Sequence, residues 1–95
     1  MTEDEAVGCA RHELARARAA HHAFNSGHEG YAVIREELDE LWDAIKARKD
    51  YAQYGDAVAY EAVQVAAMAL RFLVDLCDAD DLRAYRAGRE REQAR

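Results

Sequence analysis

The chain has 95 residues, of which 51% are hydrophobic and 34% are charged; this balance is typical of a folded globular domain and excludes a disordered segment. The formal net charge of -6 argues against nucleic-acid binding, because a phosphate backbone repels an acidic protein. A chain of this length forms one domain with a narrow stability margin, which oligomerisation commonly widens.

Several features of the sequence indicate a cytoplasmic protein. Cys9 and Cys77 lack metal-ligand spacing, so we expect free thiols that behave as small hydrophobic side chains. The acidic N-terminal segment, MTEDEAVGCARHE, does not read as a signal peptide. No apolar stretch is expected to be long enough to span a bilayer. We therefore expect a cytoplasmic location and no membrane partner.

The sequence predicts an all-α fold. It contains no proline, much alanine and no segment that alternates polar and apolar residues, a pattern that favours helices. We predict helices over residues 3–24, 27–48, 57–77 and 82–92, which form a small antiparallel bundle of three main helices and a short polar one. The single domain spans 1–95, with its core in 3–77 and a polar helix or tail in 78–95, and oligomerisation is expected to complete it.

Local patterns support these boundaries. The first helix carries one narrow apolar stripe, formed by Val7, Ala10, Leu14, Ala17, His21 and Phe24. His21 is therefore predicted to pack in the core. Ser26 followed by Glu29 predicts a capping box at the start of the second helix, and Asp56 is a candidate N-cap of the third.

The second helix combines a wide apolar face with an acidic flank. Its apolar face consists of Tyr31, Ile34, Leu38, Leu41, Trp42 and Ile45. Glu37 and Glu40 lie one turn apart on the flank, and Glu36 adjoins them. Like charges at this spacing repel one another, and a divalent cation would relieve the repulsion.

The third helix is apolar on nearly every face, which predicts that it is buried in the bundle or in a subunit interface. Its polar exceptions are Glu61, Gln64, Arg71 and Asp75. At about 100° per residue these four fall within about 80° of one another. A narrow polar stripe on a buried helix must face a wet cleft or other polar groups.

Acidic side chains on two neighbouring helices predict a shared cation. Carboxylate and amide oxygens suit Mg²⁺, which keeps several waters and takes its other ligands from protein and phosphate. We predict Glu37, Glu40, Glu61 and Gln64 as ligands of Mg²⁺, with Mn²⁺ as an alternative ion. An acidic protein that binds a polyanionic substrate needs such a metal to receive it.

Two stretches of the chain resemble the MazG-like, all-α NTP pyrophosphatases. They read HEGYAVIREELDELWDAI and EAVQVAAMALRFL, and the resemblance covers about residues 24–76. That family has EExxE on one helix and ExxD on the next and holds Mg²⁺ between them. Glu36, Glu37 and Glu40 match the first element and Glu61 starts the second, but Gln64 stands where the family usually has aspartate.

The resemblance implies an activity, a substrate and an assembly. The expected reaction is hydrolysis of an NTP or dNTP to a nucleoside monophosphate and pyrophosphate, with Glu36 and Glu37 as the catalytic carboxylates. The basic residues expected to contact the substrate phosphates are Lys46, Arg48, Lys49 and Arg71. The active sites of the family usually form at subunit interfaces, so a homodimer or homotetramer is expected.

Other interpretations remain open for the same residues. The acidic segment from Glu36 to Glu40 is also compatible with a solvated helix face, and Glu61 with an ion pair to Arg71 or to a partner helix. Gln64 lowers the charge of the predicted site by one carboxylate. The alternative function is therefore a catalytically inactive helical module for oligomerisation, nucleotide sensing or partner binding.

Overall fold

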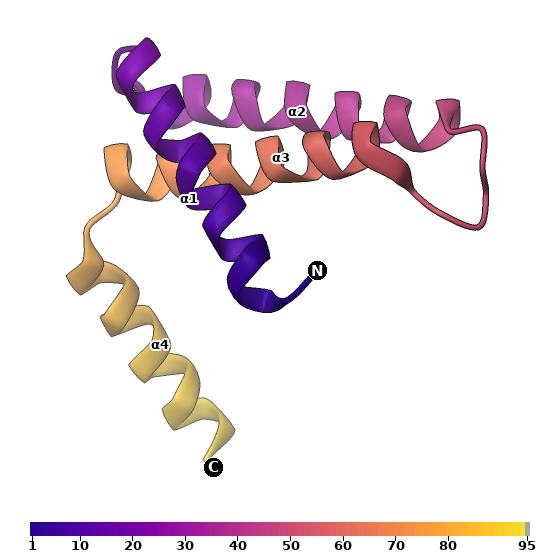
Figure 1. Ribbon diagram of the computed structural model, residues 1–95. Helices are drawn as coiled ribbons and strands as arrows, with labels where there is room; N and C mark the ends of the chain where they lie inside the picture. The colour runs from indigo at the N-terminus through magenta and orange to yellow at the C-terminus, as the bar shows by residue number, and fades with distance from the viewer. Residues whose placement is uncertain (95) are drawn as a thin grey trace.

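The computed structural model describes residues 1–94 and confirms the all-α fold (Figure 1). Within that range it contains four helices and no strand. The helices are α1 (Glu3–Ala20), α2 (Gly27–Ala47), α3 (Gly55–Leu76) and α4 (Ala79–Gln93). The order and number of helices agree with the sequence-based prediction, and the differences lie at their ends.

Three of the predicted boundaries are corrected. α1 ends at Ala20 instead of residue 24, because His21 adopts an extended backbone with φ -130° and ψ 154°. α3 begins at Gly55, whose φ of +80° suits glycine alone, and its N-cap is Tyr54. The prediction of Asp56 as N-cap was therefore wrong, since this residue lies inside the first turn. α4 begins at Ala79, three residues earlier than predicted, because Asp78 caps it through a bond from the Asp80 amide.

The start of α2 is held by half of the predicted capping box. Ser26 Oγ accepts a hydrogen bond from the Glu29 amide at 3.2 Å. The Glu29 carboxylate, however, accepts from the backbone N–H of Asn25 at 3.1 Å and not from that of Ser26. Both bonds satisfy backbone donors that have no partner within the helix. These two bonds therefore fix the end of the α1–α2 linker against the first turn of α2.

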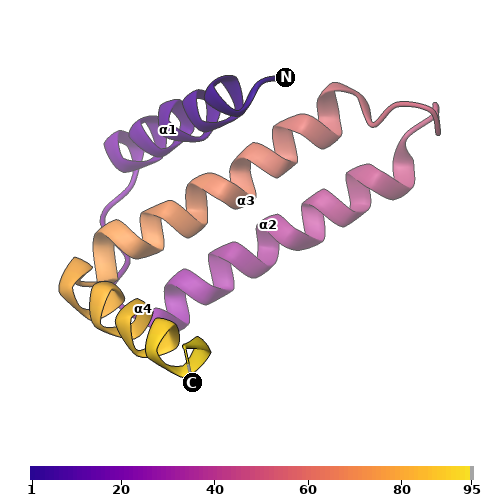
Figure 2. The same ribbon diagram turned by 90° about the horizontal axis from the view of Figure 1, so that it is seen from below.

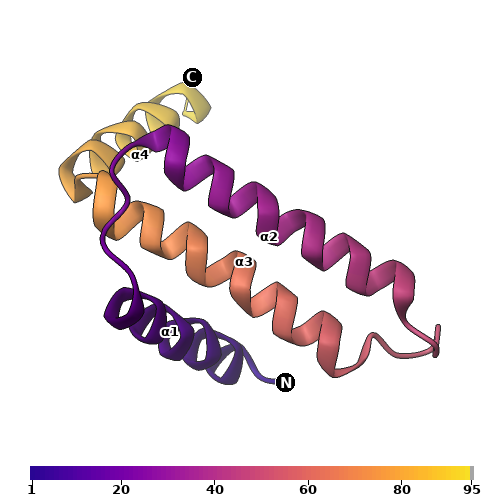
Figure 3. The same cartoon turned by 90° about the horizontal axis from the view of Figure 1, so that it is seen from above.

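α3 is the central helix of the fold. It packs against α2 on one side and against α1 on the other, whereas α1 and α2 do not pack against each other. The two 90° views agree on this order of α1, α3 and α2 (Figures 2 and 3). α2 and α3 run antiparallel and form a long hairpin. α2 and α3 lie side by side, α1 crosses the opposite side of α3 at a steep slant, and α4 lies beyond the end of α3 (Figure 1).

The core is small and lies where α1 and the α1–α2 linker meet α3. Its buried apolar members are Ala17, Phe24, Ala67 and Met68, and they are packed against Val33, Ile34, Phe72 and Leu76. Gly30 permits the closest approach, because a Cβ at this position would lie 2.5 Å from a ring carbon of Phe72. Phe24 was predicted to end the first helix on its apolar stripe; it is buried in the core, but it lies in the linker after α1.

Much of the predicted apolar surface is exposed. On α2, the apolar face is only half covered, because Tyr31, Leu38 and Trp42 are exposed. His21 was predicted to pack in the core and is instead exposed at the end of α1. Cys9 and Cys77 are also exposed and unpaired, so they are not buried hydrophobic residues. In this open arrangement of the described residues, α1 and α2 each contact α3 alone, so each helix is covered on fewer sides than in a closed bundle.

On α3, polar residues are buried and several apolar residues are exposed, which is the reverse of the usual distribution. Gln64 and Arg71 are among its buried residues, and Glu61 and Asp75 are partly buried. Leu70 and Leu73 are exposed instead. The prediction that the polar stripe meets a cleft or other polar groups is confirmed. Gln64 and Arg71 line a cleft, Asp75 pairs with Arg71, and Glu61 lies beside Glu37 and Glu40.

α3 also has the length and apolarity of a membrane-crossing helix, although 28% of its most apolar window is buried against the rest of the chain. The expectation that no stretch meets this criterion was therefore wrong. Residues 57–74 carry only two charged side chains, Glu61 and Arg71. Core helices of water-soluble proteins meet the same criterion.

Candidate metal centre

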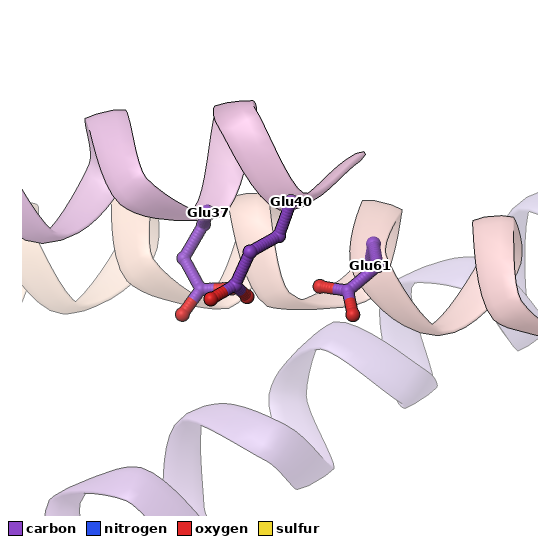
Figure 4. A group of neighbouring side chains, drawn as sticks. All are labelled: Glu37, Glu40 and Glu61. Carbon is purple, nitrogen blue, oxygen red and sulfur yellow. The ribbon is translucent and has the colours of Figure 1, made fainter. Parts of the chain in front are cut away.

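The three predicted glutamates lie together in the angle between α2 and α3. Each offers one carboxylate oxygen to a cluster in which these atoms all lie within 4.8 Å of one another. Glu37 and Glu40 point from successive turns of α2, and Glu61 points toward them from α3 (Figure 4). The antiparallel pairing of α2 and α3 brings the two sequence elements into one site.

The electrostatics of the cluster are unfavourable without a cation. Burial and the neighbouring negative charges of Glu40, Glu61 and Glu36 raise the pKa of Glu37 to about 7. Burial and Glu40 likewise raise the pKa of Glu61. Both shifts have the same physical cause, since desolvation and like charges both disfavour the ionised carboxylate.

The buried oxygens of the cluster have no protein partner. Glu37 Oε2 and Glu61 Oε2 are both shielded from solvent and accept no hydrogen bond. Within residues 1–94, none of the three glutamates forms an ion pair. Arg71, the predicted alternative partner of Glu61, pairs with Asp75. Buried carboxylates without a counter-charge are costly, and a hard cation with oxygen ligands would remove that cost.

Two other residues from the predicted site lie outside the cluster. Glu36 is exposed on α2 and affects the cluster only through its charge. Gln64 is buried, with 6% of its surface exposed, and its Nε2 has no hydrogen-bond partner. Gln64 lies near Glu13 of α1, whose pKa it helps to lower. Gln64 therefore belongs to the boundary with α1 more than to the three-glutamate cluster.

A buried carboxylate on α1 was missed by the sequence analysis. Glu13 is buried against α3 and accepts hydrogen bonds from the Arg16 guanidinium on both of its oxygens, two of them at 2.9 Å. This pairing holds the pKa of Glu13 below its usual value. The signal was present in the sequence, because Glu13 lies three residues after Ala10 and four before Ala17 on the buried side of α1.

A cleft of about 310 Å³ opens next to Glu37 in the angle between α1 and α2. Its floor includes Gln64 and Met68 of α3, and its rim includes Arg16, His21 and His22. The cleft therefore places basic side chains from α1 and the linker opposite a carboxylate of the cluster. None of these three rim residues was predicted as a site residue.

The predicted phosphate-binding residues are not gathered at this cleft, with the exception of Arg71. Lys46 Nζ lies 3.4 Å from Asp43 and over the Trp42 ring. Arg48 donates to the Ile45 carbonyl at 2.6 Å and stacks between Tyr51 and Tyr54. Lys49 is exposed in the loop that follows α2. These three residues lie at the α2–α3 turn and line no part of the cleft.

Arg71 lines the cleft, but its guanidinium is already engaged. It donates to the His22 carbonyl at 2.7 Å, lies 3.6 Å from the Asp75 carboxylate and covers the Phe24 ring at 4.0 Å. Asp75 in turn accepts from the backbone N–H of Phe24 at 3.0 Å. In this structure Arg71 therefore anchors the α1–α2 linker to α3.

Comparison of the chain with known protein families, with characterised proteins and with solved structures finds no match. The features that bear on function are therefore the geometry of the three-glutamate cluster and the sequence pattern around it.

Proposed function

We propose that the protein is a Mg²⁺-dependent nucleoside-triphosphate pyrophosphohydrolase, which converts an NTP or dNTP to the monophosphate and pyrophosphate. The observation that carries the proposal is the convergence of Glu37, Glu40 and Glu61 from two helices with no compensating positive charge. A single solvated acidic face would not bury two unpartnered carboxylate oxygens. The resemblance of the same residues to the EExxE and ExxD elements of MazG-like enzymes adds the substrate class.

The residues present fit a hard divalent cation. Three carboxylates with one partly exposed edge leave room for water and phosphate oxygens, which Mg²⁺ retains as ligands. Mn²⁺ has similar ligand preferences and is the alternative ion. When bound, the cation would neutralise negative charge on the triphosphate.

The chain itself would orient the nucleotide and the attacking water. Glu37, which the resemblance matches to the first acidic element, is the first candidate for the carboxylate that accepts a proton from that water. Glu36, one residue before it, is the second candidate for that role. Attack of the water oxygen on the α-phosphorus breaks the bond to the bridging oxygen, and pyrophosphate leaves. Arg16, His21 and His22 line the cleft beside Glu37 and are the candidate contacts for the phosphates.

A second function is favoured by one observation. Gln64 stands where the related motif has aspartate and faces α1 instead of the glutamates. A site with one carboxylate fewer holds a cation less strongly, and such a chain would bind a nucleotide without cleaving it. The alternative is therefore a nucleotide-sensing or partner-binding module, in the same cytoplasmic setting that the free thiols favour.

Turnover distinguishes the two functions. The full chain is incubated with each of the common NTPs and dNTPs and Mg²⁺, and pyrophosphate release is measured. We expect release from at least one nucleotide and its loss in Glu61→Gln. The matched control is Asp43→Asn, an exposed carboxylate one turn beyond Glu40 on α2, which should retain activity. Absence of release from every nucleotide would contradict the hydrolase.

Metal binding is tested separately by thermal melting. A ligand that binds only the folded state raises the melting temperature, so Mg²⁺ should stabilise the wild type and Asp43→Asn but not Glu61→Gln. If Mg²⁺ stabilises the chain and no nucleotide is hydrolysed, the sensing function is supported. If Mg²⁺ has no effect on the wild type, the metal centre itself is rejected.

A further inference from the structure

The floor of the cleft beside Glu37 contains a buried amide whose nitrogen the fold does not satisfy. Gln64 is 6% exposed, and its Nε2 atom is shielded from solvent and has no hydrogen-bond partner. A side-chain amide nitrogen carries two N–H donors, and a buried donor without an acceptor costs stability. Gln64 nevertheless lines the cleft. Such a donor points to an acceptor that arrives with a ligand.

The neighbouring carboxylate does not supply this acceptor. Glu13 of α1 lies close enough for Gln64 to help lower its pKa. Both Glu13 oxygens, however, already accept hydrogen bonds from the Arg16 guanidinium at 2.9 Å. A carboxylate at position 64 would have no donor and would lie near the Glu13 charge. The glutamine thus keeps a neutral donor in a region that is crowded with acids.

The part of the cleft around Gln64 is apolar. Met68 lies one turn after Gln64 on α3, and Phe24 and Val33 line the same cleft from the linker and from α2. Phe24 and Met68 are each only 5% exposed. Small-molecule sites combine apolar walls with a few polar groups that fix the orientation of the ligand. These walls suit a planar ring, whereas the charged groups of the rim suit phosphates.

We propose that Gln64 donates a hydrogen bond from Nε2 to an acceptor atom on the base of the bound nucleotide. It is then a specificity-determining residue and not a ligand of the metal. The donor favours a base that presents a carbonyl oxygen or an unprotonated ring nitrogen at this edge, and it disfavours one that presents an amino group there. This role rests on the proposed nucleotide site but does not require turnover.

The first test is calorimetric titration of the full chain, with Mg²⁺ present, by the non-hydrolysable α,β-methylene analogue of each common NTP and dNTP. Gln64→Met removes the donor and keeps a side chain of similar length. It should weaken binding of the preferred analogue roughly threefold to tenfold, the usual value of one hydrogen bond, and narrow the differences between bases. Inorganic triphosphate, which has no base, should bind both proteins equally.

The second test is thermal melting without ligand or metal. Gln64→Met should raise the melting temperature, because it removes a buried donor that has no acceptor. A glutamine that only packs, or that donates to Glu13 in solution, predicts a lower melting temperature instead. The matched control for both tests is Gln93→Met, which makes the same change at an exposed position of α4. It should alter neither the binding nor the melting temperature.

Gln64→Asp distinguishes a contact to the base from a contact to the metal. The aspartate removes the donor, so binding of the preferred analogue should weaken, and Mg²⁺ should raise the melting temperature no more than in the wild type. A larger effect of Mg²⁺ in Gln64→Asp would identify residue 64 as a metal position and overturn the inference.

Four further results would also overturn it. They are a wild type that binds no analogue, unchanged analogue affinities in Gln64→Met, an equal loss for inorganic triphosphate, and a lower melting temperature of Gln64→Met. Base-selective binding through Gln64 without release of pyrophosphate would reject the hydrolase and leave this role standing. Release of pyrophosphate with the same base preference in the wild type and Gln64→Met would do the reverse.

Discussion

At the scale of single residues, the burial of charge decides what the site can do. Glu37 and Glu61 are partly buried, lie within reach of Glu40 and have no counter-ion. Glu13 is more deeply buried, but Arg16 compensates it, and its pKa moves in the opposite direction. The contrast between these carboxylates marks the uncompensated pair as the candidate functional centre.

The metal-free chain should lose stability as the pH rises between about 4.5 and 7. The folded state keeps a proton on Glu37 up to a pKa of about 7, whereas the unfolded state releases it near 4.5. The folded state thus binds more protons in this interval, so the free energy of unfolding falls as the pH rises. Urea unfolding of wild type and Glu37→Gln at pH 5 and pH 8, without metal, checks this.

The neutral variant Glu37→Gln should show a weaker loss of stability between the two pH values than the wild type. Added Mg²⁺ should also stabilise the wild type more at pH 8 than at pH 5, because protons compete with the cation for the carboxylates. Equal pH dependence of the wild type and the variant would show that Glu37 is not the titrating group.

Gly30 determines how closely α2 approaches α3. An alanine there would bring its Cβ to 2.5 Å and 2.9 Å from two ring carbons of Phe72. We expect Gly30→Ala to lower the free energy of unfolding by about 1–3 kcal/mol, the usual cost of overpacking. Gly8→Ala is the control, since its Cβ meets nothing within 4 Å, and it should stabilise α1 by roughly 0.5–1 kcal/mol. Urea unfolding measures both.

At the scale of elements, the α1–α2 linker is positioned by α3. Arg71 binds the His22 carbonyl and Asp75 binds the Phe24 amide, which carries the linker across the end of the core. The linker in turn supplies His21 and His22 to the rim of the cleft. Two charged residues of an apolar helix are therefore used to fix a backbone segment that has no helix of its own.

Breaking this anchor should be costly. Asp75→Ala leaves the Arg71 charge buried beside an unpartnered Phe24 amide, and removal of one partner of a buried pair typically costs about 3–5 kcal/mol. The exposed pair of Asp80 and Arg83 on α4 supplies the control, because Asp80→Ala should change the free energy of unfolding by less than about 1 kcal/mol. Chemical denaturation of the two variants measures both changes in the free energy of unfolding. A loss of similar size in both variants would contradict the role assigned to Asp75.

At the scale of the whole molecule, the three packed helices form the stable unit and α4 stands apart from them. Among the described residues α4 does not pack against α1, α2 or α3 and none of its residues is buried; Leu82 lines a pocket with Leu73 and Val74 at the end of α3. Figure 1 shows α4 directed away from the other three helices. Its exposed Leu82 and Tyr85 bury too little surface to hold it against the other helices.

Deletion of α4 should leave the rest of the protein intact. A chain that ends at Asp78 should keep the melting temperature of the full chain and its increase with Mg²⁺, because no buried contact is lost. Thermal melting with and without Mg²⁺ checks this. A large drop in melting temperature would show that α4 contributes to the packed unit.

The four helices, their order and the convergence of the three glutamates were predictable from the residue pattern. Spacings of three and four residues identify helix faces, and the cost of Glu61 in an apolar helix is visible without coordinates. The sequence could not determine which apolar residues form the core, because Tyr31 and Trp42 carry the same periodic signal as the partly buried Ile34. Nor could it place Arg48 and Lys49 away from the cleft, since the path of a loop does not follow from periodicity.

Which side of α3 is buried depends on the packing of α1, which only the tertiary structure shows. This helix meets α3 alone, so Glu13, Gln64 and Arg71 become buried polar groups, while the opposite side of α3 stays apolar and exposed. Side-chain burial depends on which helices are neighbours, and a pattern local to one helix does not contain that information. The antiparallel contact of α2 with α3 is the second feature that periodicity does not contain. This contact brings Glu37 and Glu40 of α2 together with Glu61 of α3 in one site.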